Sequence, residues 1–289
     1  MARPRRRHRL ERLVLASSAL LFACASKEVS EPPLDSSVAE ELRKLARLRV
    51  YFGHQSVGEN IVLGLEDIKQ QAGVSGPRIE RLDPGAPPSG PAFLHSAVGQ
   101  NHAPDSKFEA FLSLMDGPLA GKVDVAFVKL CYVDIDKETN VDAVFARYVA
   151  LVEAMKSRHP DVKLVHVTAP LMVKEGYGRF KYLIKSALGM ENDNVRRNRY
   201  GQLLRDKYAG ELVFDLERIE STYPDGSRES FDSGRHFGLV HGYTSDGGHL
   251  NEIGRRRVAR ELVRLLATVS PQPAAGANAP EAGAGSGTE

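Results

Sequence analysis

The sequence predicts a three-layer α/β/α sandwich built on a mainly parallel, five-stranded sheet. Short β-rich runs alternate along the chain with segments in which apolar residues recur at helical period. Such alternation favours parallel strands, because each strand must return to the sheet through a crossover helix. The run at residues 123–131 is nearly all apolar, which is typical of a central strand covered on both faces.

Each element has its own local signal. Gly53 stops the first β-rich run, and Pro170 stops the fourth. The expected strands cover residues 49–53, 78–82, 123–131, 163–168 and 212–216. The expected helices cover residues 57–72, 107–115, about 141–155, 195–208 and 252–267, and a Pro/Gly loop covers 83–92. Three arginines of the fourth helix, Arg196, Arg197 and Arg199, are expected on its solvated face.

Both ends of the chain look non-globular. Residues 1–23 join a cationic stretch to a short apolar run, as a signal peptide does. The run ends in Leu21-Phe22-Ala23-Cys24, which resembles a lipobox with Cys24 as the lipidated residue. We expect residues 24–41 to be a tether and residues 42–269 to be one hydrolase-like domain. Residues 270–289 are almost all Ala, Gly, Pro, Ser and acid, which predicts a disordered tail.

This leader predicts an exported protein that a lipid anchor holds in a bacterial envelope, at the outer membrane or in the periplasm. The alternative is a secreted, soluble protein, because Ala23-Cys24-Ala25 also fits ordinary signal cleavage. The net charge is only +2 and much of the positive charge lies in the leader, so the body carries no basic stripe for nucleic acid. With Cys24 lipidated or removed, Cys131 is left as a single thiol and no disulfide framework is available.

Ser56 stands between the first expected strand and the first expected helix. A hydroxyl there lies at the rim of the sheet, where free N–H groups of the helix and its dipole favour an oxyanion. Asp246 and His249 stand three apart in a Gly-containing turn before the last helix. An Asp that hydrogen-bonds His Nδ1 leaves Nε2 free to accept a serine proton. Taken singly, Ser56 could be a helix cap, and Asp246 and His249 could be turn and capping residues.

Together the two blocks resemble the SGNH (GDSL-type) hydrolase superfamily, of which the chain looks like a divergent member. That family has a Gly-Asp-Ser block after its first strand and an Asp-x-x-His block before its last helix. Here Gly53-His54-Gln55-Ser56 and Asp246-Gly247-Gly248-His249 stand at those places, with His54-Gln55 replacing the single Asp. The resemblance covers about residues 49–267. It implies an SGNH/flavodoxin-like fold and an esterase or deacylase that uses Ser56, His249 and Asp246 and needs no cofactor.

The resemblance also implies an oxyanion hole, and here the chain departs from the pattern. Gly99 stands at about the place of the family's oxyanion glycine. The family's third block, Gly-x-Asn-Asp, is replaced by Leu130-Cys131-Tyr132-Val133-Asp134, which has no Gly or Asn. Asn101, from the neighbouring loop, and the hydroxyl of Tyr132 are the two candidates for the missing donor.

Three functions stay open at this point. The first is a hydrolase of small-molecule, polysaccharide or lipid esters. The second is a glycan- or lipid-binding protein on the same scaffold, which the altered third block favours and the retained triad residues oppose. The third is a metal hydrolase, although the candidate ligands lack a tight metal spacing, so we expect no metal. Those ligands are His54, Asp232, His236, His241, Asp246 and His249.

Overall fold

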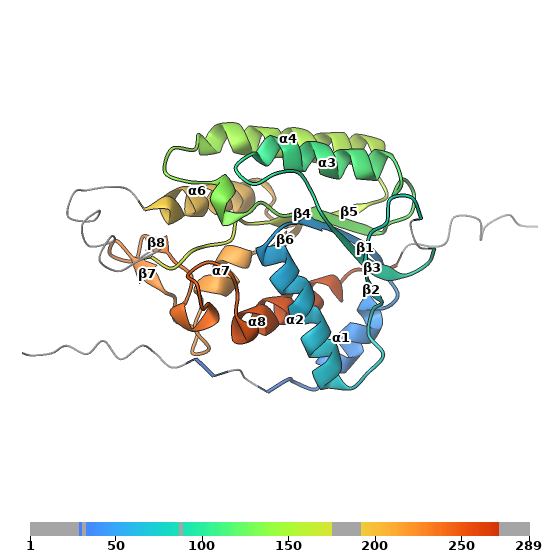
Figure 1. Cartoon of the computed structure of the whole chain (residues 1–289), viewed down its shortest axis with the longest axis horizontal. Coiled ribbons are helices and arrows are strands. Elements are labelled where there is room, and N and C mark those ends of the chain that lie inside the picture. Colours follow the sequence, from blue (N-terminus) through green and yellow to red (C-terminus); the bar gives the residue numbers. More distant parts are fainter. Residues whose placement is uncertain (1–28, 31–32, 87–88, 175–191, 272–289) are drawn as a thin grey trace, which may run out of the picture.

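The computed structural model describes residues 29–30, 33–86, 89–174 and 192–271 (Figure 1). A six-stranded sheet, in the order β2-β3-β1-β4-β5-β6, forms the middle layer, and every pairing within it is parallel. The strands are β1 (Arg49–His54), β2 (Ile79–Arg81), β3 (Ala92–Ala97), β4 (Val125–Val128), β5 (Lys163–Val167) and β6 (Leu212–Phe214). The α/β class and the parallel sheet predicted from the sequence are therefore confirmed.

The predicted number of strands is wrong, because β3 was not expected. Its sequence, Ala-Phe-Leu-His-Ser-Ala, follows directly on a Pro/Gly-rich stretch and shows no strict alternation. It becomes a strand through its neighbours: β1 pairs with it along six residues, and β2 pairs with its other edge. Two further short strands, β7 (Ser230–Phe231) and β8 (His236–Phe237), form a separate hairpin.

Helices cover both faces of the sheet (Figure 1). One side carries α3 (Pro104–Asp116), α4 (Val141–Arg158) and α6 (Asp193–Lys207). The other carries α1 (Val38–Leu45), α2 (Val57–Ala72), α7 (Leu216–Ser221) and α8 (Glu252–Leu266). Each face of the sheet has its own apolar core. Val50 and Phe52 of β1 pack in the core on the side of α1, α2 and α8, and Tyr51 packs in the core on the side of α3 and α4. This is the pattern expected of a strand buried on both faces.

The folded body begins earlier than the expected boundary at residue 42. Helix α1 starts at Val38, and Asp35 before it pairs with Arg260 of α8 at 2.9 Å. Val38 is 1% exposed, so this part of the expected tether packs on the domain. No helix in the described ranges is long and apolar enough to cross a membrane. The predicted signal peptide, Cys24 and nearly all of the predicted tail lie outside the described residues.

Candidate active site

Ser56 lies in a sharp turn between β1 and α2, at the carboxyl edge of the sheet. Its backbone has φ 48° and ψ −102°, a left-handed conformation that non-glycine residues rarely adopt. Its side chain makes no capping hydrogen bond, although it occupies the N-cap position of α2. The structure therefore does not support the alternative in which the Ser56 side chain only caps the helix. Strain of this kind costs of order 1–3 kcal/mol and concentrates at functional sites.

The structure brings His249 and Asp246 to this serine from the other end of the chain. Ser56 Oγ lies 2.7 Å from His249 Nε2, and His249 Nδ1 lies 2.6 Å from Asp246 Oδ2. The His249 side chain is 42% exposed, so the line of three groups is open to solvent. An imidazole in this position can accept the hydroxyl proton, and the carboxylate behind it stabilises the resulting imidazolium.

Helices α2 and α8 hold the two segments together. Gly64 of α2 lies so close to α8 that a Cβ there would meet the Arg255 carbonyl oxygen at 2.3 Å. The N–H of Leu250 donates to Asn60 Oδ1 at 3.1 Å, which links the first turn of α2 to the residue after His249. Asn251 caps α8 by accepting the N–H of Gly254 at 3.0 Å. These contacts keep Ser56 and His249 in register across a long separation in sequence.

Asp246 remains a carboxylate over the whole useful pH range. Burial opposes its ionisation, but hydrogen bonds from the Gly248 N–H and from the side chain and N–H of His249 outweigh that effect and lower its pKa from 3.8 to about 2. Because the pKa is depressed in the fold, these interactions stabilise the protein above about pH 4, and the stabilisation is lost as the pH falls towards 2. The group is half exposed, so the effect on stability is small.

Gln55 links the turn that carries Ser56 to the Gly99 loop. Its Nε2 donates to the carbonyl oxygens of Val98, at 3.0 Å, and of Gly99. Gly99 has φ 57°, and a Cβ there would lie 2.5 Å from the backbone of Lys107, so only glycine fits. Among the described residues, the N–H groups of Ser56 and Gly99 have no hydrogen-bond acceptor. In the sequence, Gln55 stood out only because His54-Gln55 replaces the Asp of the Gly-Asp-Ser block, and its bridging role was not predicted.

A buried ion pair supports the loop that carries Asn101. Lys107 Nζ donates to Asp134 Oδ2, and both side chains are fully buried. The same Nζ donates to Asn101 Oδ1 at 3.0 Å, and Asp134 Oδ1 accepts the N–H of His102 at 2.9 Å. Asp134 also accepts the N–H of Cys131 at 2.6 Å. The Asp134 carboxylate thus joins the loop after β3 to the loop after β4. Because Lys107 occupies only Oδ1 of Asn101, Asn101 Nδ2 stays a candidate oxyanion donor.

Removing one partner of this pair is expected to be strongly destabilising. Lys107→Met keeps the length of the side chain but leaves the Asp134 charge buried without its cation, which costs about 3–5 kcal/mol. Urea unfolding followed by circular dichroism would measure the loss. Asp105→Asn in the same helix breaks an exposed pair with Arg147 and should cost less than about 1 kcal/mol. Equal losses from the two variants would contradict a structural role for the buried pair.

Tyr132 lies against His249. Its hydroxyl is 3.4 Å from His249 Nε2, and its ring meets the imidazole edge-on with centroids 5.6 Å apart. A Cβ at Gly248 would lie 3.0 Å from this ring, so glycine there leaves room for the tyrosine. Arg197 Nε donates to the Tyr132 carbonyl oxygen at 2.9 Å. Arg197 is 2% exposed, and its expected place on a solvated face is wrong, because it supports this segment.

The structure does not gather the six candidate metal ligands suggested by the sequence. Among the described residues, the one cluster with metal-ligand chemistry is His54, Glu59 and His95. His54 Nε2 and His95 Nδ1 are 3.0 Å apart, and the two rings are almost parallel at 15° with centroids 5.2 Å apart. This arrangement fits one N–H···N hydrogen bond, in which one imidazole nitrogen donates its N–H and the other accepts with its lone pair. Burial lowers the pKa of both imidazoles, which keeps the pair neutral.

No family model matches the chain, and no curated protein was found to match it. Solved structures that are similar to it include the lipase/acylhydrolase from Enterococcus faecalis, at 14% identity and a TM-score of 0.47, covering 78% of this chain and 98% of that one. An acetyl xylan esterase is 17% identical with a TM-score of 0.44, covering 74% and 96%. A carbohydrate esterase family 3 structure from Talaromyces cellulolyticus is 15% identical with a TM-score of 0.43, covering 77% and 100%.

Proposed function

We propose that the protein is a carboxylic ester hydrolase with Ser56 as its nucleophile. The observation that carries this is the unbroken line from Ser56 Oγ through His249 to Asp246, with distances of 2.7 and 2.6 Å. As Oγ attacks the ester carbonyl carbon, His249 Nε2 accepts the hydroxyl proton. The proton then passes to the leaving alkoxide, and the acyl group stays on Ser56. Water activated by His249 releases the acid and restores the serine.

The tetrahedral oxyanion needs donors close to Ser56. The N–H groups of Ser56 and Gly99 are available because no described residue accepts them. We assign the third donor, which the family's third block would supply, to the hydroxyl of Tyr132, because it already lies 3.4 Å from His249 Nε2. Asn101 is the second candidate, since its Oδ1 accepts from Lys107 while its Nδ2 can still donate.

Tyr132→Phe tests this assignment. Loss of one oxyanion donor is expected to lower kcat for p-nitrophenyl acetate by about 10²-fold while KM changes little, because the hydrogen bond forms fully only in the transition state. Tyr223→Phe is a matched control, since the Tyr223 hydroxyl donates to Glu229 instead. An unchanged kcat in Tyr132→Phe would move the role to Asn101, and Asn101→Ala would then show the loss.

We also propose that the chain is exported and anchored to a bacterial membrane through Cys24, as the Leu21-Phe22-Ala23-Cys24 sequence indicates. An ester at the envelope, such as an acetylated glycan or a lipid ester, is then the substrate class within reach. Mass spectrometry of the mature N-terminus would find the diacylglyceryl group on Cys24. Cleavage after Ala25 without lipid would instead identify a soluble secreted enzyme.

A further inference from the structure

The described chain begins beside the catalytic edge. The side chain of Val29 fills the space above Gly242 so closely that a Cβ on that glycine would lie 2.4 Å from Val29 Cγ2. The Gly242 carbonyl oxygen accepts from Asn251 Nδ2 at 2.9 Å. Asn251 is only two positions beyond His249. Val29 therefore packs next to the turn that carries His249.

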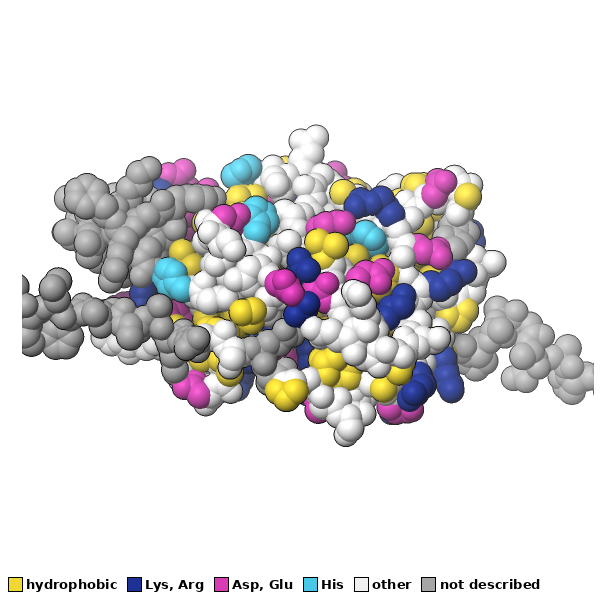
Figure 2. Space-filling view, turned by 60° about the horizontal axis from the view of Figure 1, so that its bottom comes forward, with side chains coloured by type: hydrophobic (Ala, Val, Ile, Leu, Met, Phe, Trp, Pro, Cys, Tyr) yellow, Lys and Arg dark blue, Asp and Glu magenta, His cyan; other side chains and the backbone are white. Residues whose placement is uncertain are grey.

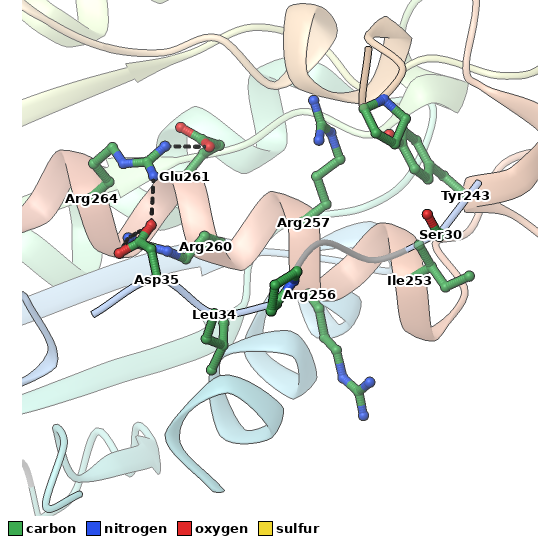
Figure 3. A pocket seen from close by; sticks show the side chains of 12 residues that line it. Ser30, Leu34, Asp35, Tyr243, Ile253, Arg256, Arg257, Arg260, Glu261 and Arg264 are labelled. Atoms are coloured by element: carbon green, nitrogen blue, oxygen red, sulfur yellow. Dashed lines mark hydrogen bonds and ion pairs between the residues drawn. The ribbon is translucent and has the colours of Figure 1, made fainter. Parts of the chain in front are cut away.

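Residues 33–37, which we call the strap, lie along α8 and form hydrogen bonds with its arginines. Asp35 of the strap accepts hydrogen bonds from Arg260 Nη2 at 2.9 Å and from Arg264 Nη2 at 3.3 Å (Figure 3). Ser37 Oγ accepts from the same Arg260 at 3.0 Å. Because both arginines belong to α8, the strap holds the N-terminal segment at a defined place on the domain.

A cavity of about 310 Å³ lies between the strap and α8 (Figure 3). Asp35 and Glu261 are the acids in its wall, and both pair with arginines of α8. Arg257 has no acidic partner among the described residues, and its guanidinium faces the Tyr243 ring at 5.6 Å. The arginines in the wall of the cavity are Arg256, Arg257, Arg260 and Arg264. A guanidinium that has no acidic partner and lies beside apolar side chains suits the phosphate of a lipid, which is attached to hydrocarbon chains.

Resting on the anchored ester hydrolase proposed above, we propose that the part of α8 around Arg257, next to the catalytic edge, lies against an anionic phospholipid surface. Arg257 contacts a lipid phosphate, and the catalytic edge faces the bilayer and acts on esters held in the membrane. Cys24 stands five positions before Val29, a span of at most about 18 Å. An acyl group on Cys24 would therefore be held within this distance of Val29, which packs on Gly242. The face of the molecule that includes α1, α2 and α8 carries basic and acidic side chains side by side (Figure 2).

The orientation can be measured with the lipidated full-length chain in vesicles. Two variants carry a thiol-reactive dye, one at His241→Cys beside Gly242 and one at Lys122→Cys, in the exposed loop before β4 at the opposite edge of the sheet. Cys131 is buried and does not compete for the dye. In phosphatidylglycerol vesicles, a head-group nitroxide should quench the dye at position 241 several-fold more than the dye at 122. Equal quenching, or stronger quenching at 122, would overturn the orientation.

The contact between Arg257 and a lipid phosphate is tested in the same vesicles with the same dye-labelled proteins. Arg257→Gln should reduce the difference in quenching between the two positions, and Asp35→Asn should reduce it by releasing the strap. Arg147→Gln on α4 removes the same charge from the other side of the sheet and should leave the difference intact. No effect of Arg257→Gln would overturn the phosphate contact. Hydrolysis of soluble p-nitrophenyl acetate reports the triad separately, and a mature chain without an acyl group would overturn the membrane orientation while leaving the hydrolase.

Discussion

Ser56→Ala is expected to lower kcat for p-nitrophenyl acetate by about 10⁴-fold or more, to the level that transition-state binding alone supports. The variant keeps the turn and the helix, because the Ser56 side chain makes no capping bond that alanine would lose. His249 then has no hydroxyl to deprotonate, and no acyl-enzyme can form. The measurement is steady-state hydrolysis together with labelling by a fluorophosphonate.

Ser113→Ala is the matched control, since Ser113 is an exposed serine on α3. It should keep full activity and full labelling. Activity that survives in Ser56→Ala would exclude the serine mechanism. A wild-type protein that neither hydrolyses short esters nor reacts with the fluorophosphonate would instead favour the binding protein considered from the sequence, and ligand binding indifferent to Ser56→Ala would support that outcome.

Asp246→Asn is expected to lower kcat by about 10²–10⁴-fold. The amide can hold His249 in place only in the wrong tautomer, or as a weaker acceptor, and it does not stabilise the imidazolium. Asp232→Asn, in the turn between β7 and β8, changes an exposed carboxylate of the same type and should keep wild-type activity. Circular dichroism checks that both variants fold.

The pH profile tests whether Asp246 stays ionised while the enzyme works. Because the pKa of Asp246 is held at about 2, this carboxylate stays ionised throughout an assay from pH 4 to 9. A decline of kcat/KM on the acid side of this range therefore does not come from protonation of Asp246. The decline should persist in Asp246→Asn on a lower plateau. A decline that disappears with Asp246 would assign the titration to the carboxylate and contradict the mechanism.

The sequence by itself determined the α/β class, the approximate bounds of most elements and the three residues, Ser56, His249 and Asp246, that the structure brings into one line. These follow from local signals: the apolar periods of strands and helices, and polar residues placed where a strand gives way to a helix. Ser56 could be singled out because carboxyl ends of parallel strands share one edge of the sheet.

Only the tertiary structure decided which neighbours complete the site. Strand β3 has a weak pattern of its own and exists because β1 and β2 pair with both its edges. The same holds for the supports of the site, whose partners stand far away in sequence: Arg197 beneath Tyr132, and Lys107 with Asp134. From sequence alone, a lysine or arginine is expected to be exposed to solvent, because burying a charge costs free energy. Long-range packing alone supplies the carbonyl or carboxylate that makes its burial favourable, and no local pattern encodes that partner.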